Sequence, residues 1–387
     1  MKLWPFSKPV KVEKKDAASS FFDYLWPSAT TKTGIVVTPE RAMRQVTAYA
    51  CVRIISETVA QIPLHVFERG SDGTKERDTA SALHRIFSRS ANPWTTAYQF
   101  KSDMTADVLL HGSAFALVQR DAEGNTRYLT KWPARAVHVE EDRLTGEPRY
   151  RVTLNDGGSR IYAHTDVLHL RATGGLSPIQ QAKEAIAIAL SQEGELADLL
   201  TSGMRPAGVL TFENEMSDSA LERAQAQFTA LNKSKGTAIL DGSAKYHALG
   251  MAGADAQFLE GRRHQVAEIA RAFRVPLHML QELERTTHLN AEQLGRQFLQ
   301  LTMLPWLKMW EQSLNLVLFA DDQSRYAEFM VDDLQRADLA SRMEAYAKAV
   351  QAGLLNPNEV RSMENRAPYE GGDKFLRPLN MEEAGNG

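Results

Sequence analysis

The chain has 387 residues, 43% of them hydrophobic, and its 45 basic and 48 acidic residues give a net charge of −3. This length predicts two or three domains with sizeable cores, and the near-neutral charge excludes tight nucleic-acid binding through a general basic field. The single cysteine, Cys51, excludes a disulfide framework and a cysteine-rich metal site, and no segment approaches the ~20 apolar residues of a membrane span. We therefore expect a globular protein without membrane contact.

Residues 1–26 are expected to form a flexible N-terminal arm. They contain five lysines and several charged neighbours, and no apolar run is long enough for a signal peptide. Aromatic residues gather between positions 21 and 26, where local packing is favoured over contact with a partner.

Residues 27–175 are expected to combine helices with an antiparallel sheet. A helix capped by Thr38 runs to about Ala60, and a second helix ends at Gly112. Short alternating segments, separated by turns rich in Asp, Asn and Gly, then predict strands as far as Leu170. This part of the chain therefore belongs to the α+β class.

The next helix has a strong start at residues 177–180, where a Ser cap is followed by Pro at the first position and Gln at the third. The glycines just before it form no Walker A or GxGxxG motif, so a simple cap is favoured over a phosphate site. The helix runs to about Gly203 and cannot pass Pro206. Residues 206–250 then predict a small α/β insertion, with strands over 208–212, 237–240 and 245–249 and a short amphipathic helix over 217–232.

The stretch 255–293 predicts a helix, a sharp stop, a polar loop and another helix. The apolar face of its first helix consists of Leu259, Val266, Ile269, Ala270 and Phe273. Pro276 ends that helix, because it lacks an N–H and forces the preceding residue out of the helical region. The polar loop, 281–288, has little apolar content, and Asn290 can cap the helix that follows.

The C-terminal part is expected to be mainly helical. A long helix from about 291 to 319 contains Pro305, which predicts a kink. Two shorter helices follow, one over 337–352 and one capped by Asn356. The last residues, from Gly371 onwards, are expected to fade into disorder.

The sequence contains no recognisable catalytic motif. Glu260, His264 and Glu268 share a helix face at spacings of four, but zinc needs a further convergent ligand and no HExxH motif exists, so a solvated or inter-subunit face is favoured. Cys51 lies in an apolar helix, which indicates packing rather than a nucleophile. The Lys233-Ser234-Lys235 spot is either merely solvated or a contact for DNA or a partner. We expect no enzyme and no cofactor.

Short motifs spread from Val46 to Asp373 are informative in their order and spacing, although each is weak alone. They include Tyr49-Ala50-Cys51-Val52, Gly112-Ser113-Ala114-Phe115, Leu176-Ser177-Pro178-Ile179, Arg205-Pro206-Ala207-Gly208, Asp255-Ala256-Gln257-Phe258-Leu259-Glu260 and Ile269-Ala270-Arg271-Ala272-Phe273-Arg274-Val275-Pro276. Together they resemble the HK97-type portal proteins of tailed phages and of gene transfer agents. The resemblance covers nearly the whole chain.

This resemblance implies an α+β portal fold and a dodecameric ring at one capsid vertex, through which double-stranded DNA is packaged and later ejected. The fold would comprise an α/β wing (27–175 and 291–336), a two-helix stem (176–205 and 251–279), a small α/β clip (206–250), a tunnel loop (280–290) and a short helical crown with the C-terminus (337–387). The implied partners are the terminase large subunit, a head–tail adaptor and the major capsid protein. The protein would reside in the virion after assembly in the host cytoplasm.

The resemblance also suggests roles for individual residues. Those expected to face DNA in the tunnel loop are Glu282, Glu284, Arg285, Thr286 and His288. Those expected to contact terminase or the adaptor in the clip are Lys233 and Lys235, and those expected to serve ring assembly in the stem are Leu259, Val266, Ile269 and Phe273. The terminase ATPase would supply the energy, which accounts for the lack of a nucleotide motif.

One departure from the family concerns the start of the loop. Arg274 stands where the family usually has Gly before Val-Pro, and Arg does not favour a left-handed backbone as Gly does. Leu277-His278 likewise replaces a common proline-rich pair. Two rival functions stay open: a soluble ring adaptor or scaffold that never meets DNA, and a metal-dependent hydrolase that uses Glu260, His264 and Glu268.

Overall fold

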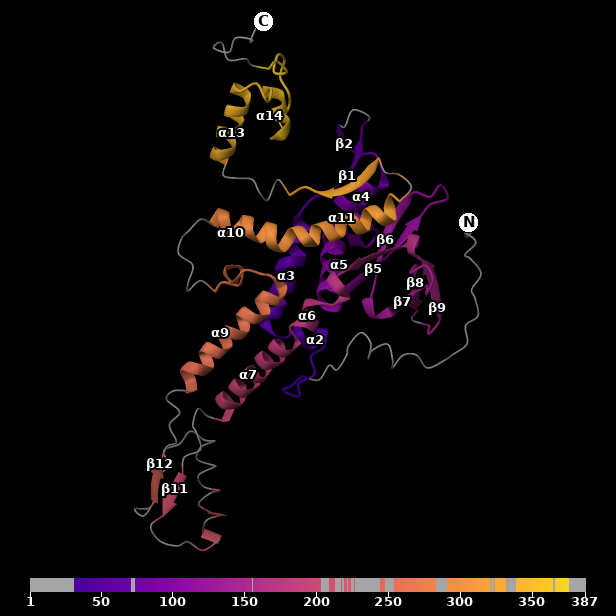
Figure 1. Cartoon of the computed structure of the whole chain (residues 1–387). Coiled ribbons are helices and arrows are strands. Elements are labelled where there is room, and N and C mark those ends of the chain that lie inside the picture. Colours follow the sequence, from indigo (N-terminus) through magenta and orange to yellow (C-terminus); the bar gives the residue numbers. More distant parts are fainter. Residues whose placement is uncertain are drawn as a thin grey trace.

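The structure is a computed structural model that describes residues 31–70, 74–154, 156–202, 209–212, 217, 219–220, 222–223, 226, 244–247, 254–282, 291–320, 322, 324–331, 339–364 and 366–375. Helices and small antiparallel sheets form a compact part, here called the body, from which two long helices project side by side (Figure 1). We call this helix pair, α7 and α9, the stalk. The expected mixed helix-and-sheet class is confirmed.

The first helical segment of the body is divided into two helices, α2 (Pro39–Ala42) and α3 (Val46–Gln61). Thr38 caps α2 as expected, because its side chain accepts a hydrogen bond from the backbone N–H of Arg41. The expectation of one helix as far as Ala60 is wrong. Gln45 has an extended backbone and its side chain accepts the N–H of Ala48 at 2.7 Å, so a new helix begins there.

The second helical segment contains α4 (Ala82–Ser88), which sequence analysis missed, and α5 (Ala97–His111). The strands β3 (Ser90–Asn92) and β4 (Thr95–Thr96) lie between them. Gly112 ends α5 with a φ of 81°, as its position suggested, and a Cβ there would overlap the carbonyl group of Gly175. Only glycine fits this approach between the end of α5 and the turn before α6.

The body contains three three-stranded antiparallel sheets, where one sheet was expected. Their strand orders are β13-β1-β2, β10-β5-β6 and β7-β8-β9. The first consists of β13 (Arg325–Phe329), β1 (Leu64–Arg69) and β2 (Lys75–Arg77); the second of β10 (Val167–Arg171), β5 (Ser113–Arg120) and β6 (Thr126–Trp132); the third of β7 (Val137–Glu141), β8 (Pro148–Thr153) and β9 (Ser159–Ala163). A second, small apolar core packs the third sheet against the second, because Phe115 of β5 and Val167 of β10 join Val137, Tyr150 and Val152 in it.

The stalk begins with α6 (Pro178–Gln181) and α7 (Lys183–Ser202), and returns along α9 (Ala254–Phe273). The predicted capping box of Ser177 and Gln180 is present in full. The single helix expected from Ser177 is interrupted at Ala182, which leaves the helical conformation.

At the far end of the stalk, β11 (Val209–Phe212) pairs antiparallel with β12 (Ala244–His247) (Figure 1). The predicted strand over 208–212 is therefore confirmed, and the one over 245–249 begins a residue early. Most of the predicted helix 217–232 and the predicted strand 237–240 lie outside the described residues.

The long C-terminal helix is interrupted where Pro305 predicted a kink. It consists of α10 (Ala291–Gln297), a π-helical segment η5 (Phe298–Met303) and α11 (Leu304–Leu318). Because Pro305 has no N–H to donate, the helix widens in the turn before it. The short 3-10 helices of the chain are η1 (Ala134–Ala136), η2 (His164–Asp166), η3 (Thr173–Gly175) and η4 (Leu277–Leu280).

Two helices near the C-terminus, α13 (Leu339–Gln351) and α14 (Pro357–Met363), match the predicted pair. Asn356 caps α14 in a capping box, as expected. The expectation of disorder from Gly371 is wrong for residues 371–375. Asn358 holds this segment, since its Nδ2 donates to the carbonyl of Tyr369 and to Asp373, and its N–H donates to the carbonyl of Gly372.

The main core lies between α3, α5 and α11 and includes the body ends of α7 and α9. Trp310 is fully buried at its centre, where its Nε1–H donates to Thr105 Oγ1 at 3.0 Å and its ring meets Phe100 edge to face. In the described part of the chain, no helix has the length and apolar character needed to span a membrane.

Candidate functional site

The junction between stalk and body is built around the end of α9. Arg274 has a φ of 56°, its N–H donates to Arg271 O at 3.1 Å, and the next N–H, of Val275, donates to Ala270 O at 2.9 Å. These two bonds form a Schellman C-cap, which normally has Gly at the left-handed position. The backbone therefore adopts the left-handed turn that Arg274 was not expected to favour, at a cost of roughly 1–2 kcal/mol.

The π-helical segment between α10 and α11 stabilises the turn at Arg274. The hydroxyl of Thr302, in the π-helical segment η5, donates to the carbonyl of Arg274 at 2.5 Å. Thr302 is buried, so the bond is shielded from water. The two irregular backbone segments on either side of the expected tunnel loop are thus hydrogen-bonded to each other.

Beyond Pro276 the chain forms η4 and then a second left-handed residue, Gln281, with a φ of 64°. Glu282 follows, exposed, with its N–H directed to the carbonyl of Leu277 at 3.2 Å. Of the five residues expected to face DNA, Glu282 is therefore placed at the exposed end of this turn. The other four, Glu284, Arg285, Thr286 and His288, lie outside the described residues, as do Lys233 and Lys235 of the insertion.

The stem residues divide into two kinds. Ile269 and Phe273 are 0% and 2% exposed within the single chain, where they belong to the main core. The expectation that these two side chains contact a neighbouring subunit is therefore corrected, because no surface is left on them for a partner. Val266 is half-buried and lines a groove described below, whereas of Leu259 only the helical backbone is described.

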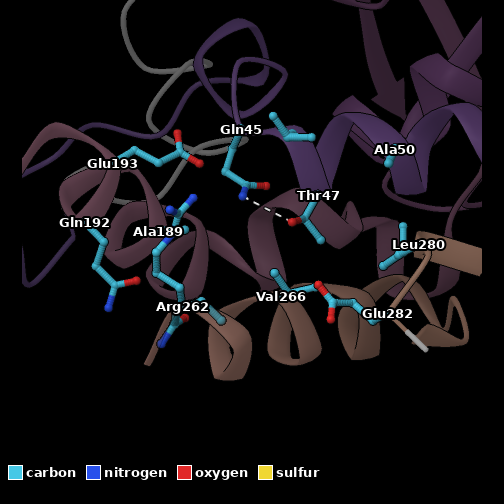
Figure 2. A pocket seen from close by; sticks show the side chains of 12 residues that line it. Gln45, Thr47, Ala50, Ala189, Gln192, Glu193, Arg262, Val266, Leu280 and Glu282 are labelled. Carbon is cyan, nitrogen blue, oxygen red and sulfur yellow. Dashed lines mark hydrogen bonds between the residues drawn. The ribbon is translucent and has the colours of Figure 1, made fainter. Parts of the chain in front are cut away.

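A groove of about 320 Å³ lies where the stalk meets the body (Figure 2). Side chains enter it from the start of α3, from α7, from α9 and from the end of η4. Its lining consists of Gln45, Val46, Thr47, Ala50, Ala189, Gln192, Glu193, Arg262, Gln265, Val266, Leu280 and Glu282. The groove is therefore mixed in character, with apolar walls, amide groups and a charged rim, and it begins beside the expected tunnel loop.

The outer face of α9 carries charges of both signs. Arg271 and Glu268 form an ion pair, and His264 Nε2 lies 4.0 Å from Glu268 Oε1. Within the described residues, no group of three histidine, cysteine or acidic side chains is arranged to hold a metal ion. Glu260, His264 and Glu268 share the predicted face, and Glu268 is already engaged by the Arg271 guanidinium.

Two buried polar side chains in the body escaped the sequence analysis. Lys101 is 4% exposed, its Nζ donates to Ile62 O at 2.7 Å, and burial lowers its pKa to about 8. His169 lies between Tyr150 OH and Ser113 Oγ, each at 3.2 Å, and burial lowers the pKa of its imidazole to about 4. For Lys101 a signal existed, because it stands four residues after Ala97 and three before Met104 on the apolar face of α5.

Comparison with known proteins identifies the family. The model of the family described as phage portal protein matches residues 46–365, which is most of the chain. The chain belongs to the phage portal protein family. The portal protein of Enterobacteria phage HK97 is 30% identical over 356 residues, which cover 88% of this chain and 83% of that protein.

Solved portal structures share the fold. An HK97-family portal protein from Corynebacterium diphtheriae aligns with a TM-score of 0.59 at 19% identity, covering 80% of this chain and 98% of that one. The neck of a native gene transfer agent particle, determined with C12 symmetry, aligns with a TM-score of 0.59 at 20% identity, covering 92% and 94%. The family resemblance inferred from the short motifs is confirmed.

Proposed function

We propose that twelve copies of this chain form a ring at one capsid vertex, through which double-stranded DNA enters during packaging and leaves at ejection. The observation that carries this proposal is the portal family match over residues 46–365. The neck structure with C12 symmetry supports the number of subunits. In this ring the body would be the wing, the stalk the stem, the β11–β12 end the clip, and α13 with α14 the short crown.

A channel in which duplex DNA slides must not hold phosphates tightly, because each neutralised phosphate adds to a salt-dependent affinity. The net charge of −3 and the mixed charges of α9 suit that requirement. Arg271, the basic residue in the last turn of α9, has its guanidinium paired with Glu268 although its side chain is 68% exposed. Its attraction for a passing phosphate is therefore reduced by the neighbouring carboxylate.

The tunnel loop, residues 280–290, is the proposed constriction. Glu282 at its start is exposed, and Glu284, Arg285, Thr286 and His288 complete a polar segment of mixed charge. We expect these side chains to bind DNA only weakly, because the acidic ones repel the phosphates that the basic one attracts. The anchoring of Arg274 by Thr302 gives the loop a fixed base at the end of α9.

The remaining partners follow from the same proposal. Lys233 and Lys235 of the clip would contact the terminase large subunit during packaging and the head–tail adaptor afterwards. The outer part of the wing would meet the major capsid protein, and assembly would take place in the host cytoplasm before the ring enters the virion. The chain itself would be structural, with the terminase ATPase supplying the energy.

Site-specific cross-linking tests the channel. Glu282 is replaced by the photoreactive residue p-benzoylphenylalanine, and Leu144, which is 96% exposed in a turn of the wing, is replaced in a matched control. In DNA-filled particles we expect illumination to attach DNA to position 282 and not to position 144. A ring in which neither position captures DNA would support an adaptor that never meets DNA and overturn the proposal.

A further inference from the structure

The groove between stalk and body contains two amide oxygens that the single chain leaves without a hydrogen-bond partner. Gln192 Oε1 on α7 and Gln265 Oε1 on α9 are both buried and accept no hydrogen bond. Both residues line the groove. A third glutamine in the same lining, Gln45, is satisfied, since its side chain accepts the N–H of Ala48 at 2.7 Å and donates to Thr47 Oγ1 at 3.3 Å (Figure 2).

A buried oxygen that accepts no hydrogen bond lowers the stability of the folded chain. Buried polar groups are nearly always hydrogen-bonded in native proteins, and each one left unsatisfied costs about 1–3 kcal/mol. Other buried atoms without a partner lie in the body, among them His65 Nδ1, Ser81 Oγ and Thr130 Oγ1. Gln192 and Gln265 differ in lining one groove from two neighbouring helices, where hydrogen-bond donors from outside the chain can reach both. Glu193, Arg262 and Glu282 add charges of both signs to the same lining.

The surface that continues from the groove is apolar and exposed. Val46 is 71% exposed at the edge of the groove, and Tyr49, one turn further along α3, is 42% exposed. Subunits of a ring contact each other head to tail, so each must present a surface that is incomplete in the isolated chain. An apolar strip that leads into a recess with unsatisfied acceptors has the composition of such a surface.

We propose that the neighbouring copy of this chain in the ring fills the groove and donates hydrogen bonds to Gln192 and Gln265. This inference rests on the proposed ring and adds to it the location of a subunit contact at the base of the tunnel loop. It also links neighbouring subunits to the channel, because Leu280 and Glu282 share the lining with the two glutamines.

A rival occupant is the N-terminal arm of the same chain. The N–H of Lys32 donates to Glu184 Oε2 at 3.2 Å, so the described part of the chain begins beside α7. Glu184 lies eight residues before Gln192 on that helix, which is about 12 Å at 1.5 Å per residue. The experiments below distinguish this occupant from a second copy.

The first experiment tests the variants Gln192→Met and Gln265→Met. Each should stabilise the folded subunit and weaken assembly of the ring. Methionine keeps the length of the side chain and removes the unsatisfied amide, so the dissociated full-length subunit should unfold at a temperature a few degrees higher. The ring should dissociate about tenfold more readily for each variant, since a lost hydrogen bond with its desolvation is of order 1.4 kcal/mol. Thermal unfolding and analytical ultracentrifugation measure the two quantities.

The control is Gln99→Met, because Gln99 is exposed on α5 and its amide is in contact with water. This variant should assemble and unfold as the native chain does. If the native chain forms rings and both groove variants assemble equally well, the second-copy contact is wrong while the ring stands. If the native chain forms no ring under any condition, the proposed function fails as well.

The second experiment identifies the occupant directly. Val46 is replaced by p-benzoylphenylalanine at the edge of the groove, and the assembled protein is illuminated. A ladder of covalently joined subunits is expected and supports the proposal. A cross-link from position 46 to residues 1–30 of the same chain, without such a ladder, overturns it in favour of the arm.

Discussion

The body and the stalk satisfy their buried polar groups in different ways. In the body, Trp310 donates to Thr105, Lys101 donates to the carbonyl of Ile62, and Glu311 accepts the N–H of Phe329 at 3.0 Å. On the stalk, Gln192 and Gln265 have buried oxygens without a donor. The body is not fully satisfied either, since His65 Nδ1, Ser81 Oγ and Thr130 Oγ1 are also buried without a partner. The two stalk oxygens differ from these atoms because they line one common groove, where a second molecule can reach them.

The boundary between the two regions passes through α9. Its last turns place Ile269 and Phe273 in the main core of the body, and its earlier turns carry the half-exposed and exposed residues of the stalk. Substitutions near Phe273 should therefore act on folding, and substitutions facing the groove should act on assembly. Four predictions test this division, in order of decreasing expected effect on stability.

The largest effect is expected in the centre of the body. Trp310→Ala removes a fully buried indole and its hydrogen bond to Thr105, and should lower the free energy of unfolding by about 3–5 kcal/mol. Urea denaturation of the dissociated subunit measures this change. Leu316→Ala is the control, because Leu316 lies on the same helix but is 72% exposed and should change stability by less than about 0.5 kcal/mol. Similar losses for both variants would contradict the position of the core.

The next prediction concerns pH and His169. Burial and the nearby charge of Arg171 lower its pKa to about 4, against an ordinary value of about 6.5. Between pH 6.5 and pH 4 the unfolded chain therefore binds a proton at this residue that the folded chain does not. Stability should therefore be complete above pH 6.5 and fall by about 3 kcal/mol as pH falls towards 4. Urea denaturation at several pH values measures the slope.

A second buried histidine makes this prediction more specific. Burial also lowers the pKa of His65 to about 4 and lowers the pKa of His111, so the native slope includes the protons of more than one histidine. His169→Gln keeps groups that can bond to Ser113 and Tyr150 and should make the slope clearly smaller. An unchanged slope in this variant would show that His169 is protonated in the folded body.

The third prediction lies at the boundary itself. Arg274→Gly relieves the left-handed backbone at φ 56° and should raise the free energy of unfolding by about 1 kcal/mol, after the greater freedom of glycine in the unfolded chain is subtracted. Arg274→Val should instead destabilise the protein, because a β-branched side chain tolerates this conformation least. Thermal unfolding of the two variants gives the comparison. Equal stabilities would mean that the backbone strain is absent.

The smallest effect on stability is expected on the outer face of the stalk. Glu268→Gln breaks an exposed ion pair with Arg271, which is worth less than about 1 kcal/mol. It leaves one uncompensated guanidinium in each subunit, so retention of duplex DNA by the ring should increase at low salt and disappear at high salt. Filter binding over a range of salt concentrations measures this, with Glu344→Gln on α13 as the control. Unchanged retention would place this face of α9 outside the channel.

The sequence was most informative where structure depends on local chemistry. The caps at Thr38, Ser177 and Asn356, the glycine at the end of α5 and the interruption near Pro305 are all decided by neighbouring backbone groups. Long-range pairing was not visible, as in the antiparallel contact of Leu64 with Phe329, because no local pattern selects the partner of an edge strand.

The groove could not be predicted for a related reason. Gln192 and Gln265 are ordinary half-buried positions of two helices, and only the packing of α7 against α9 leaves their oxygens buried without donors. Arg274 is the reverse case. Arginine disfavours a left-handed turn, but the two Schellman hydrogen bonds and the bond from Thr302 stabilise one at this position. In both cases the hydrogen bonding and packing of the folded chain decide the outcome, and the residue type alone does not reveal it.

Cryo-electron microscopy of the purified full-length protein tests the central claim most directly. We expect closed rings of twelve subunits with α7 and α9 beside a central hole, Glu282 facing that hole, and the groove at Gln192 and Gln265 filled by the adjacent subunit. Monomers at all concentrations, or rings in which the stalk and Glu282 lie on the outer rim, would contradict it.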